Sequence, residues 1–411
     1  MVKPGYKQTE IGVIPEDWEI KYLSDFGKIQ SGGTPSTTMA EYWGGNIAWC
    51  TPSDITSTPT KYINVTERTI TEAGLNNSAA TVMPAGSILL CTRATIGELK
   101  INSIPMATNQ GFKNITVNNS GNAEFLYYLL QTKKSRMLDL AIGSTFLEIS
   151  KTALSKILLQ IPMRDEQNKI ADALSDMDNL VVVLEKQIAK KKAIKQGTMQ
   201  ELLTGKRRLP GFFGEWVNTK IGSITEVYSG GTPNTSEPAF WGGKIPWMNS
   251  GELNLKIVRQ VQGRITEVGM DSSSTHFIPA ECVLIGLAGQ GKTRGTAAFN
   301  TFPLCTNQSI AAIYPNPNKF DSKFLYYKMD TQYDQLRELS SGDGGRGGLN
   351  KKLILDYEVV IPQSIDEQAA IATILTEMDY EIENLEMKLT KYRQVKQGMM
   401  QQLLTGKIRI L

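Results

Sequence analysis

The chain has 411 residues, 41% of them hydrophobic and 21% charged, which indicates a globular protein of at least two domains. The N-terminus has no apolar core of the signal-peptide type, and the apolar runs are too short to span a membrane, so we expect a cytoplasmic protein. The net charge of +3 neither requires nor excludes nucleic acid, so a DNA-binding face would have to arise from local clustering of basic residues.

The cysteine and histidine content argues against metal sites, disulfide bonds and catalysis by histidine. The four cysteines, Cys50, Cys91, Cys282 and Cys305, are widely spaced and form no Cys-x-x-Cys pair, which argues against a zinc site and a disulfide framework. His276 is the single histidine, so a multi-histidine metal site cannot form and a histidine base has little scope. We therefore expect no metal, no cofactor and a reducing environment.

The first globular region, of about 160 residues, mixes short apolar runs with glycine, proline and asparagine. The runs at 87–91, 112–117 and 156–161 predict strands, and the stretch 124–138 predicts a helix among them. This mixture indicates an α+β domain.

A long helix is predicted next, over 165–203, because this segment contains no proline and its apolar residues alternate by four and three. The same heptad pattern returns near the C-terminus, and it drives knobs-into-holes packing between helices. The residues expected at this packing seam are Ile170, Leu174, Met177 and Leu184 in the first helix and Ile371, Leu375, Met378 and Leu385 in the second. Two helices joined through an intervening domain would most naturally run antiparallel. The alternative is that each helix packs on its own domain.

The whole chain repeats itself at an offset of about 200 residues. Ser31–Pro35 (Ser-Gly-Gly-Thr-Pro) recurs as Ser229–Pro233, and the Leu-Leu-Thr-Gly-Lys block at 202–206 recurs at 403–407. Trp-Gly-Gly, Thr-Asn-Gln, Phe-Leu-Tyr-Tyr and Glu-Gln blocks recur between them. A unit of this size is too large for a solenoid repeat, so each copy must contain a domain of its own. The sequence predicts an α+β fold with two tandem-duplicated mixed α/β domains and two long antiparallel coiled-coil helices.

Several blocks of the sequence resemble the specificity subunits of type I restriction–modification enzymes. They are Gly12–Trp18 (Gly-Val-Ile-Pro-Glu-Asp-Trp), the Ser-Gly-Gly-Thr-Pro and Trp-Gly-Gly blocks, the Glu-Gln pairs that follow a proline at the start of each helix, and the closing block at 401–407. The resemblance covers essentially the whole chain. The second copy has Phe212–Trp216 where the first has Val-Ile-Pro-Glu-Asp-Trp, and this change keeps Trp216 in register with Trp18.

The resemblance implies a non-catalytic DNA-recognition subunit. It implies target-recognition domains at 1–162 and 207–362, each reading one half of a split site in double-stranded DNA. It implies helical spacer regions at 163–206 and 363–411, which set the gap between the half-sites and dock two methyltransferase subunits. A restriction subunit can join such an assembly, and no membrane is involved.

Polar residues between or within the matched blocks are candidate DNA contacts, because Arg, Lys, Asn, Gln and hydroxyl side chains bind base edges and phosphates. In the first copy they are Thr92, Arg93, Thr95, Asn109, Gln110, Ser144 and Thr145, and in the second they are Lys292, Thr293, Arg294, Asn307, Gln308 and Arg346. The alternative is that these are ordinary solvated loops. The Asn-Gln pairs match between the copies, which favours a framework role over the reading of a variable base.

Two other functions compete with this interpretation. The segment 286–293 matches the phosphate-loop pattern of a nucleoside triphosphatase, but a true phosphate loop opens a helix, whereas residues 294–303 are typical of a turn and a strand. The corresponding segment of the first copy, 91–97, lacks the pattern. A coiled-coil scaffold that binds only proteins is the second alternative.

Overall fold

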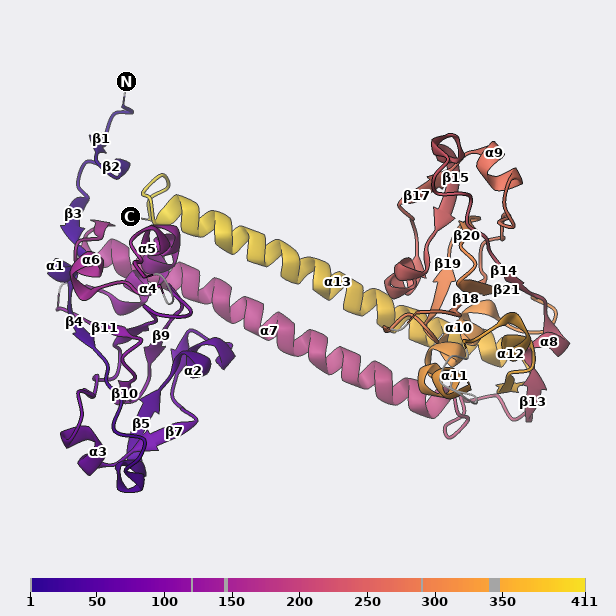
Figure 1. Cartoon of the computed structure of the whole chain (residues 1–411), viewed down its shortest axis with the longest axis horizontal. Coiled ribbons are helices and arrows are strands. Elements are labelled where there is room, and N and C mark those ends of the chain that lie inside the picture. The colour runs from indigo at the N-terminus through magenta and orange to yellow at the C-terminus, as the bar shows by residue number, and fades with distance from the viewer. Residues whose placement is uncertain (1, 120, 144–146, 290, 340–347, 411) are drawn as a thin grey trace. The chain divides into compact units, whose positions relative to one another are not determined.

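The computed structural model describes residues 2–119, 121–143, 147–289, 291–339 and 348–410. The chain divides into two compact units: unit 1 comprises residues 1–187 and 386–411, and unit 2 comprises residues 188–385. Each unit therefore contains one mixed α/β domain, the first part of the long helix that follows that domain, and the last part of the other long helix (Figure 1).

Unit 1 is built from short strands and helices. Its strands are β1 Tyr6–Thr9, β2 Gly12–Pro15, β3 Glu19–Tyr22, β4 Gly27–Ser31, β5 Trp43–Cys50, β6 Tyr62–Ile63, β7 Arg68–Ile70, β8 Ile88–Leu90, β9 Leu99–Asn102, β10 Met106–Thr108, β11 Lys113–Val117 and β12 Leu158–Ile161. Its short helices are α1 Leu23–Phe26, η1 Ala40–Tyr42, α2 Pro52–Ser57, α3 Glu72–Asn76, α4 Ala123–Thr132, α5 Lys134–Asp139 and α6 Lys151–Ser155. The single helix predicted over 124–138 is thus two helices, α4 and α5, which meet at Lys133.

Unit 2 repeats this plan. Its strands are β13 Trp216–Lys220, β14 Val227–Ser229, β15 Trp241–Met248, β16 Ile257–Val258, β17 Gly263–Ile265, β18 Val283–Gly286, β19 Ala297–Asn300, β20 Cys305–Thr306, β21 Ile310–Ile313 and β22 Glu358–Pro362. Its short helices are α8 Ile221–Ile224, η2 Pro238–Phe240, η3 Ser250–Leu255, α9 Glu267–Asp271, α10 Ser322–Asp330, α11 Tyr333–Leu339 and α12 Lys351–Leu355.

The sheets of the two units have the same topology. Unit 1 has a five-stranded sheet of order β4-β11-β8-β9-β6, and unit 2 has its counterpart, β14-β21-β18-β19-β16. A three-stranded sheet accompanies each, β10-β5-β7 and β17-β15-β20, and a two-stranded sheet pairs β12 with β3 and β13 with β22. The hairpin of β1 and β2 has no counterpart among the described residues of unit 2. The tandem duplication and the fold class predicted from the sequence are confirmed.

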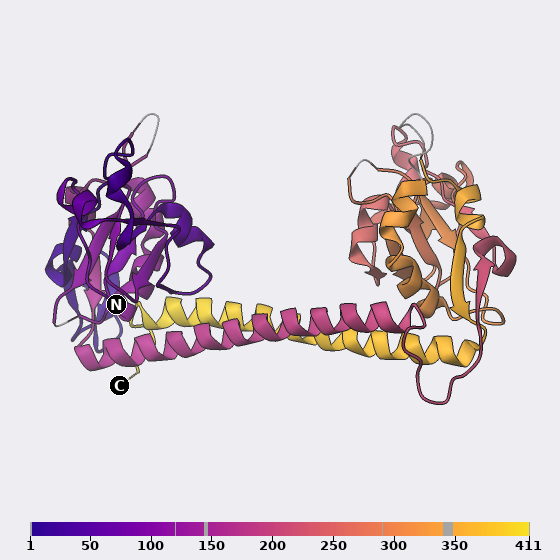
Figure 2. The ribbon, with the colours of Figure 1, turned by 90° about the horizontal axis from the view of Figure 1, so that it is seen from below.

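Two helices of 39 residues each follow the domains, α7 Arg164–Leu202 and α13 Ile365–Leu403. Within unit 1, Arg393 of α13 bonds to Glu185 of α7 at 2.6 Å, and Lys396 pairs with Asp178. The later residue of α13 thus pairs with the earlier residue of α7, so the two segments run antiparallel (Figure 2). Unit 2 has the related pairs Lys191–Glu381 at 2.6 Å and Lys195–Asp379 at 2.5 Å.

The first turns of each helix belong to the core of the domain before it. In unit 1, Ile170 and Leu174 are fully buried in one cluster with Phe125 and Leu129 of α4 and with Leu403 at the end of α13. Burying each such side chain contributes about 1.5–3 kcal/mol. In unit 2, Ile371 and Leu375 join the matching cluster, with Met378 packed against it. Both predicted modes of packing therefore occur together, because the same turns contact the domain and the partner helix.

Farther along the helices the seam is less deeply buried. Leu184 is 6% exposed, and Met177 and Leu385 are half-buried. None of the helices in the described residues is both long enough and apolar enough to cross a bilayer.

Candidate nucleic-acid interface

The matched blocks of the first copy pack on one another, which explains why they recur. A Cβ atom on Gly32 would lie 2.0 Å from the carbonyl oxygen of Asn109, so only glycine fits there. The indole nitrogen of Trp49 donates to the carbonyl of Gly33 at 2.9 Å, and Trp43 packs edge-on against Trp49 with ring centroids 5.0 Å apart. In the second copy, Trp247 donates to Gly231 at 3.0 Å and packs against Trp241 in the same way. These blocks form a common framework.

The Asn-Gln pairs divide into a framework residue and an exposed residue. Asn109 accepts a hydrogen bond from the backbone nitrogen of Gly111 at 2.9 Å, and Asn307 closes the same turn by accepting from Ser309 at 3.1 Å. The neighbouring glutamines are exposed, and Gln110 and Gln308 each accept a hydrogen bond from a threonine of the Ser-Gly-Gly-Thr-Pro block. Each glutamine keeps a carboxamide nitrogen that can donate to a base or a phosphate.

The candidates after β8 lie in different environments. Thr92 is fully buried and its hydroxyl donates to the carbonyl of Gly111, a position that does not support direct contact with DNA. Arg93 is half-buried and pairs with Glu148, which also bonds to Lys113 at 3.3 Å. The hydrogen bond from Arg93, with a smaller contribution from Lys113, holds the pKa of Glu148 below its ordinary value. Thr95 is also half-buried.

The phosphate-loop pattern of the second copy lies between two strands. The segment that contains Lys292 joins β18 to β19, and these strands pair antiparallel, with Ile285 opposite Ala297. Lys292 is exposed, whereas Thr293 and Arg294 are half-buried. Because a strand follows the pattern where a phosphate loop requires a helix, this geometry contradicts the nucleoside triphosphatase alternative. The remaining candidates, Ser144, Thr145 and Arg346, lie outside the described residues.

Arg68 is an exposed cation that the sequence did not single out as a candidate. The guanidinium carbon of Arg68 lies 3.6 Å from the ring centroid of Trp43, so the side chain is held on the three-stranded sheet by a cation–π contact. The two residues are far apart in sequence, and the local pattern around Arg68 gives no signal of their contact.

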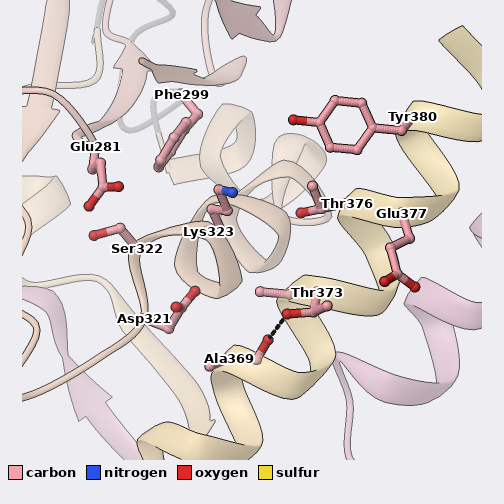
Figure 3. Close-up of a pocket in the computed structure, with 11 residues that line it drawn as sticks. Glu281, Phe299, Asp321, Ser322, Lys323, Ala369, Thr373, Thr376, Glu377 and Tyr380 are labelled. Atoms are coloured by element: carbon pink, nitrogen blue, oxygen red, sulfur yellow. Dashed lines mark hydrogen bonds between the residues drawn. The ribbon is translucent and has the colours of Figure 1, made fainter. Parts of the chain in front are cut away.

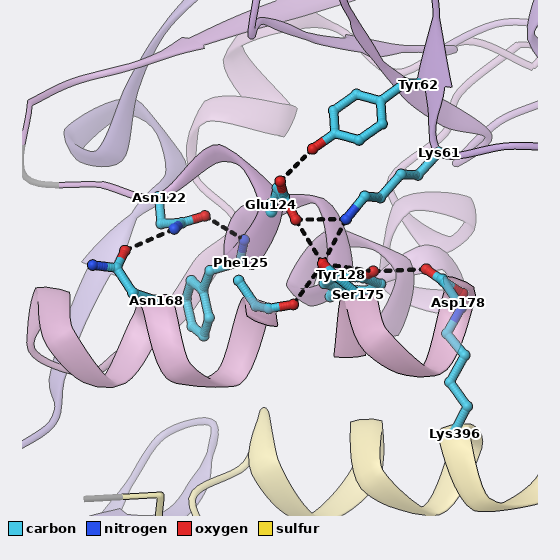
Figure 4. Close-up of polar contacts among 11 residues, drawn as sticks. Lys61, Tyr62, Asn122, Glu124, Phe125, Tyr128, Asn168, Ser175, Asp178 and Lys396 are labelled. Carbon is cyan, nitrogen blue, oxygen red and sulfur yellow. Dashed lines mark hydrogen bonds and ion pairs between the residues drawn. The ribbon is translucent and has the colours of Figure 1, made fainter. Parts of the chain in front are cut away.

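A polar network joins the unit 1 domain to α7 (Figure 4). Lys61 donates to Glu124 of α4 and to Ser175 of α7, both at 2.5 Å, and Tyr62 also donates to Glu124. Tyr128 of α4 donates to Asp178 of α7 at 2.6 Å. Burial raises the pKa of Glu124, but the hydrogen bonds from Lys61, Ser175 and Tyr62 outweigh burial and hold the pKa below 4.5.

The same junction in unit 2 is partly open (Figure 3). Tyr327 donates to Asp379 at 2.7 Å, which matches Tyr128 and Asp178 in unit 1. Lys323 stands at the position of Glu124, however, and a cavity of about 410 Å³ lies beside it between α10 and α13. Farther along α13, Arg259 and Glu383 form an exposed ion pair at 3.0 Å.

A buried glutamate at the start of each long helix binds an arginine that follows the end of the other helix. In unit 1, Glu166 is 5% exposed and accepts hydrogen bonds from Arg409 at 2.6 and 2.8 Å and from the Trp18 indole at 3.0 Å. Arg409 also bonds to Asp17, and this hydrogen bond lowers the pKa of Asp17. In unit 2, Glu367 accepts two hydrogen bonds from Arg208 at 2.6 and 2.7 Å. These ion pairs explain the recurring glutamate of the Glu-Gln blocks.

The cysteines are free and buried. Burial raises the pKa of Cys282 to about 12 and that of Cys305 to about 11, so neither thiol is activated. Among the described residues no group of His, Cys, Asp and Glu side chains could hold a metal ion.

Comparison with known proteins identifies the family of the chain. A family model, the type I restriction modification DNA specificity domain, matches the chain twice, over residues 15–196 and 214–391. The chain is 30% identical to the type I restriction enzyme MjaIX specificity subunit of Methanocaldococcus jannaschii, over 78% of each protein. It is 23% identical to the MjaVIII specificity subunit of the same organism, over 97% of this chain and 94% of that relative.

Solved structures agree with this assignment at the level of the fold. The S subunit of a type I restriction–modification system from M. genitalium superposes with a TM-score of 0.63 and 16% identity, over 98% of both chains. The fold and the doubled match define a specificity protein with two tandem target-recognition domains. The chain belongs to the type I restriction–modification DNA specificity family.

Proposed function

We propose that the chain reads a bipartite, asymmetric DNA site, with the domain at 1–162 on one half-site and the domain at 207–362 on the other. One observation carries this proposal: the two domains share sheet topology and framework contacts but differ in the segments between their strands. The connection between β8 and β9 carries Arg93, whereas the longer one between β18 and β19 carries Lys292 and Arg294. Different polar side chains on one scaffold suit two different sequences.

The helical regions at 163–206 and 363–411 set the gap between the half-sites and dock two methyltransferase subunits, which carry the chemistry, and a restriction subunit can join them. Support comes from exposed apolar side chains on the helices, because aromatic residues and methionine are enriched in protein interfaces. Val183 and Met387 of unit 1 are 49% and 58% exposed, and Tyr380 of unit 2 is 54% exposed. One structural relative, with a TM-score of 0.60, comes from work on complex assembly of the type I system.

A domain exchange tests the proposal. Residues 210–360 are replaced by the same region of a relative with another target, and methylation by the complex reconstituted with methyltransferase subunits is mapped on DNA. We expect one half of the site to change while the other half and the gap stay the same. The control is the reciprocal exchange of the first domain, which should change only the other half. A change of both halves by one exchange would show that the domains are not independent readers.

A further inference from the structure

A basic groove on unit 1 is separate from the contacts described so far. It has a volume of about 760 Å³ and lies among α5, α6, β12 and the turn of the β1–β2 hairpin. Its cationic lining residues are Lys133, Arg136 and Lys156, and its apolar lining includes Ile11, Leu140 and Ile157. A concave site with apolar walls and a few convergent polar groups is the usual form of a binding site.

The charge of the groove is strongly unbalanced. Among the described residues, Glu10 is the only acidic side chain in its lining, against three cations. Arg136 and Lys156 are exposed, and Lys133 is half-buried with its ammonium group donating to Gln160 at 2.9 Å. Within the part of the chain that the structure describes, none of the three cations is paired with a carboxylate. The groove therefore favours an anionic ligand.

Exposed apolar side chains also occur on or next to the elements that line the groove, outside the lining itself. Leu138 in α5 and Ile142 just after it are 47% and 82% exposed. Tyr22, which is 48% exposed, lies opposite Leu158 in the two-stranded sheet beside the groove. Apolar walls in the groove, with exposed apolar side chains on neighbouring elements, are typical of protein interfaces rather than of surfaces that bind a DNA backbone.

The set of three cations that lines the groove occurs in one copy of the duplicated domain only. The positions that match Lys133, Arg136 and Lys156 in unit 2 hold Gln332, Gln335 and Asp356. The hairpin that supplies Glu10 and Ile11 has no counterpart among the described residues of unit 2. A phosphate contact common to both half-sites, or a partner bound twice, would use features present in both copies. A feature present once per chain fits a partner bound once per chain.

We propose that this groove docks an acidic polypeptide segment carrying aliphatic side chains, supplied by a protein that binds the chain in a single copy. Carboxylates of the segment pair with Arg136, Lys156 and Lys133, and its aliphatic side chains pack on Leu140, Ile157 and Ile11. This partner is additional to the DNA and to the two methyltransferase subunits of the proposed function, which does not depend on it.

Selection from a library of random short peptides displayed on phage tests the proposal. The purified full chain is the target, and binders of the double variant Arg136→Glu, Lys156→Glu are removed at each round. Both side chains are exposed, so the variant should fold, and circular dichroism checks this. We expect the enriched peptides to carry net negative charge together with leucine, isoleucine or valine.

The most enriched peptide, labelled with a fluorophore, then measures affinity by anisotropy. We expect one peptide per chain and a loss of affinity of about tenfold or more in the double variant, because two charge pairs become repulsive. The matched control is Gln335→Glu, which adds a carboxylate at the position of Arg136 in unit 2 and should leave the affinity unchanged. Methylation by the reconstituted complex should keep its target in every variant.

The proposal would be overturned by no enrichment of acidic peptides, by two bound peptides per chain, or by less than a twofold loss of affinity in the double variant. Competition with a DNA duplex of unrelated sequence tests whether the groove binds DNA phosphates instead of an acidic peptide. If the duplex displaced the peptide and the double variant bound DNA correspondingly more weakly, the groove would be a phosphate contact. A chain that fails to direct methylation but still binds the peptide would refute the proposed function alone.

Discussion

Removal of the Arg409 guanidinium should destabilise unit 1 through the carboxylate that it leaves unpaired. Glu166 is 5% exposed, and Arg409 supplies two of the hydrogen bonds to that carboxylate. Removing one partner of a buried ion pair costs about 3–5 kcal/mol. The Arg409 side chain is 21% exposed, so water can partly replace it. We therefore expect Arg409→Ala to lower the free energy of unfolding of unit 1 by about 3 kcal/mol, the low end of that range.

The effect should be confined to one unit. A loss of about 3 kcal/mol corresponds to a decrease of about 6–12 °C in the melting temperature of a unit of this size, measured by calorimetry. Hydrogen exchange followed by mass spectrometry then shows which unit has lost stability. Amides of the five-stranded sheet of unit 1 should exchange faster, and those of unit 2 should not. Arg208→Ala is the matched variant, because Glu367 is 1% exposed, and it should give the opposite pattern.

A second substitution tests whether the buried charge is the cause. Glu166→Gln removes the carboxylate charge but keeps an acceptor for the Trp18 indole. In the Arg409→Ala background it should therefore restore about 1 kcal/mol or more of stability. The reasoning would be refuted if the double variant were no more stable than Arg409→Ala, or if Arg409→Ala itself cost less than about 1 kcal/mol.

Three further outcomes follow from the structure. Lys292→Ala should leave the ATP hydrolysis of the purified chain at background in a phosphate-release assay, and an activity lost in this variant would revive the triphosphatase alternative. The pKa of Glu124 is held below 4.5, so its contribution to the stability of unit 1 is present above pH 4.5 and is lost as the pH falls through the lower folded-state pKa. Glu124→Gln should therefore lower the melting temperature at pH 7 and flatten its decline below pH 4.5, and an unchanged decline would contradict this. A four-residue insertion near Ala189, matched by one near Thr390, adds about 6 Å to each helix and should lengthen the unread gap by one to two base pairs in a methylation assay, whereas an unchanged gap would leave the helices as docking surfaces only.

The features that the sequence predicted are those with a periodic or repeated signal. The heptads and the absence of proline gave the long helix over 165–203, and the structure has α7 at Arg164–Leu202. The strands expected at 87–91 and 112–117 are present as β8 and β11. The repeated blocks predicted two domains, because a duplicated framework keeps the residues that pack on one another.

The features that escaped prediction depend on contacts between distant residues. No local pattern indicates that Arg409 reaches Glu166 or that Arg68 stacks on Trp43. Thr92 is a polar residue of the kind found in exposed loops, yet tertiary packing buries it. The candidate DNA contacts stay predictions, since the structure shows which side chains are exposed and contains no DNA to show which ones bind.

The junction between each domain and its helix has a consequence for how such proteins change over evolutionary time. The helices offer each domain nearly the same set of groups: Gln167, Ser175 and Asp178 in α7 correspond to Gln368, Thr376 and Asp379 in α13. A domain fits this surface if it supplies a tyrosine like Tyr128 or Tyr327, a helix cap beside it, and apolar side chains that bury the first turns of the helix. Outside these shared contacts the two junctions differ, with a polar network in one and a cavity in the other, so the contacts that differ tolerate replacement. A foreign recognition domain could therefore be accepted by genetic exchange in one step, with no compensating change in the helices.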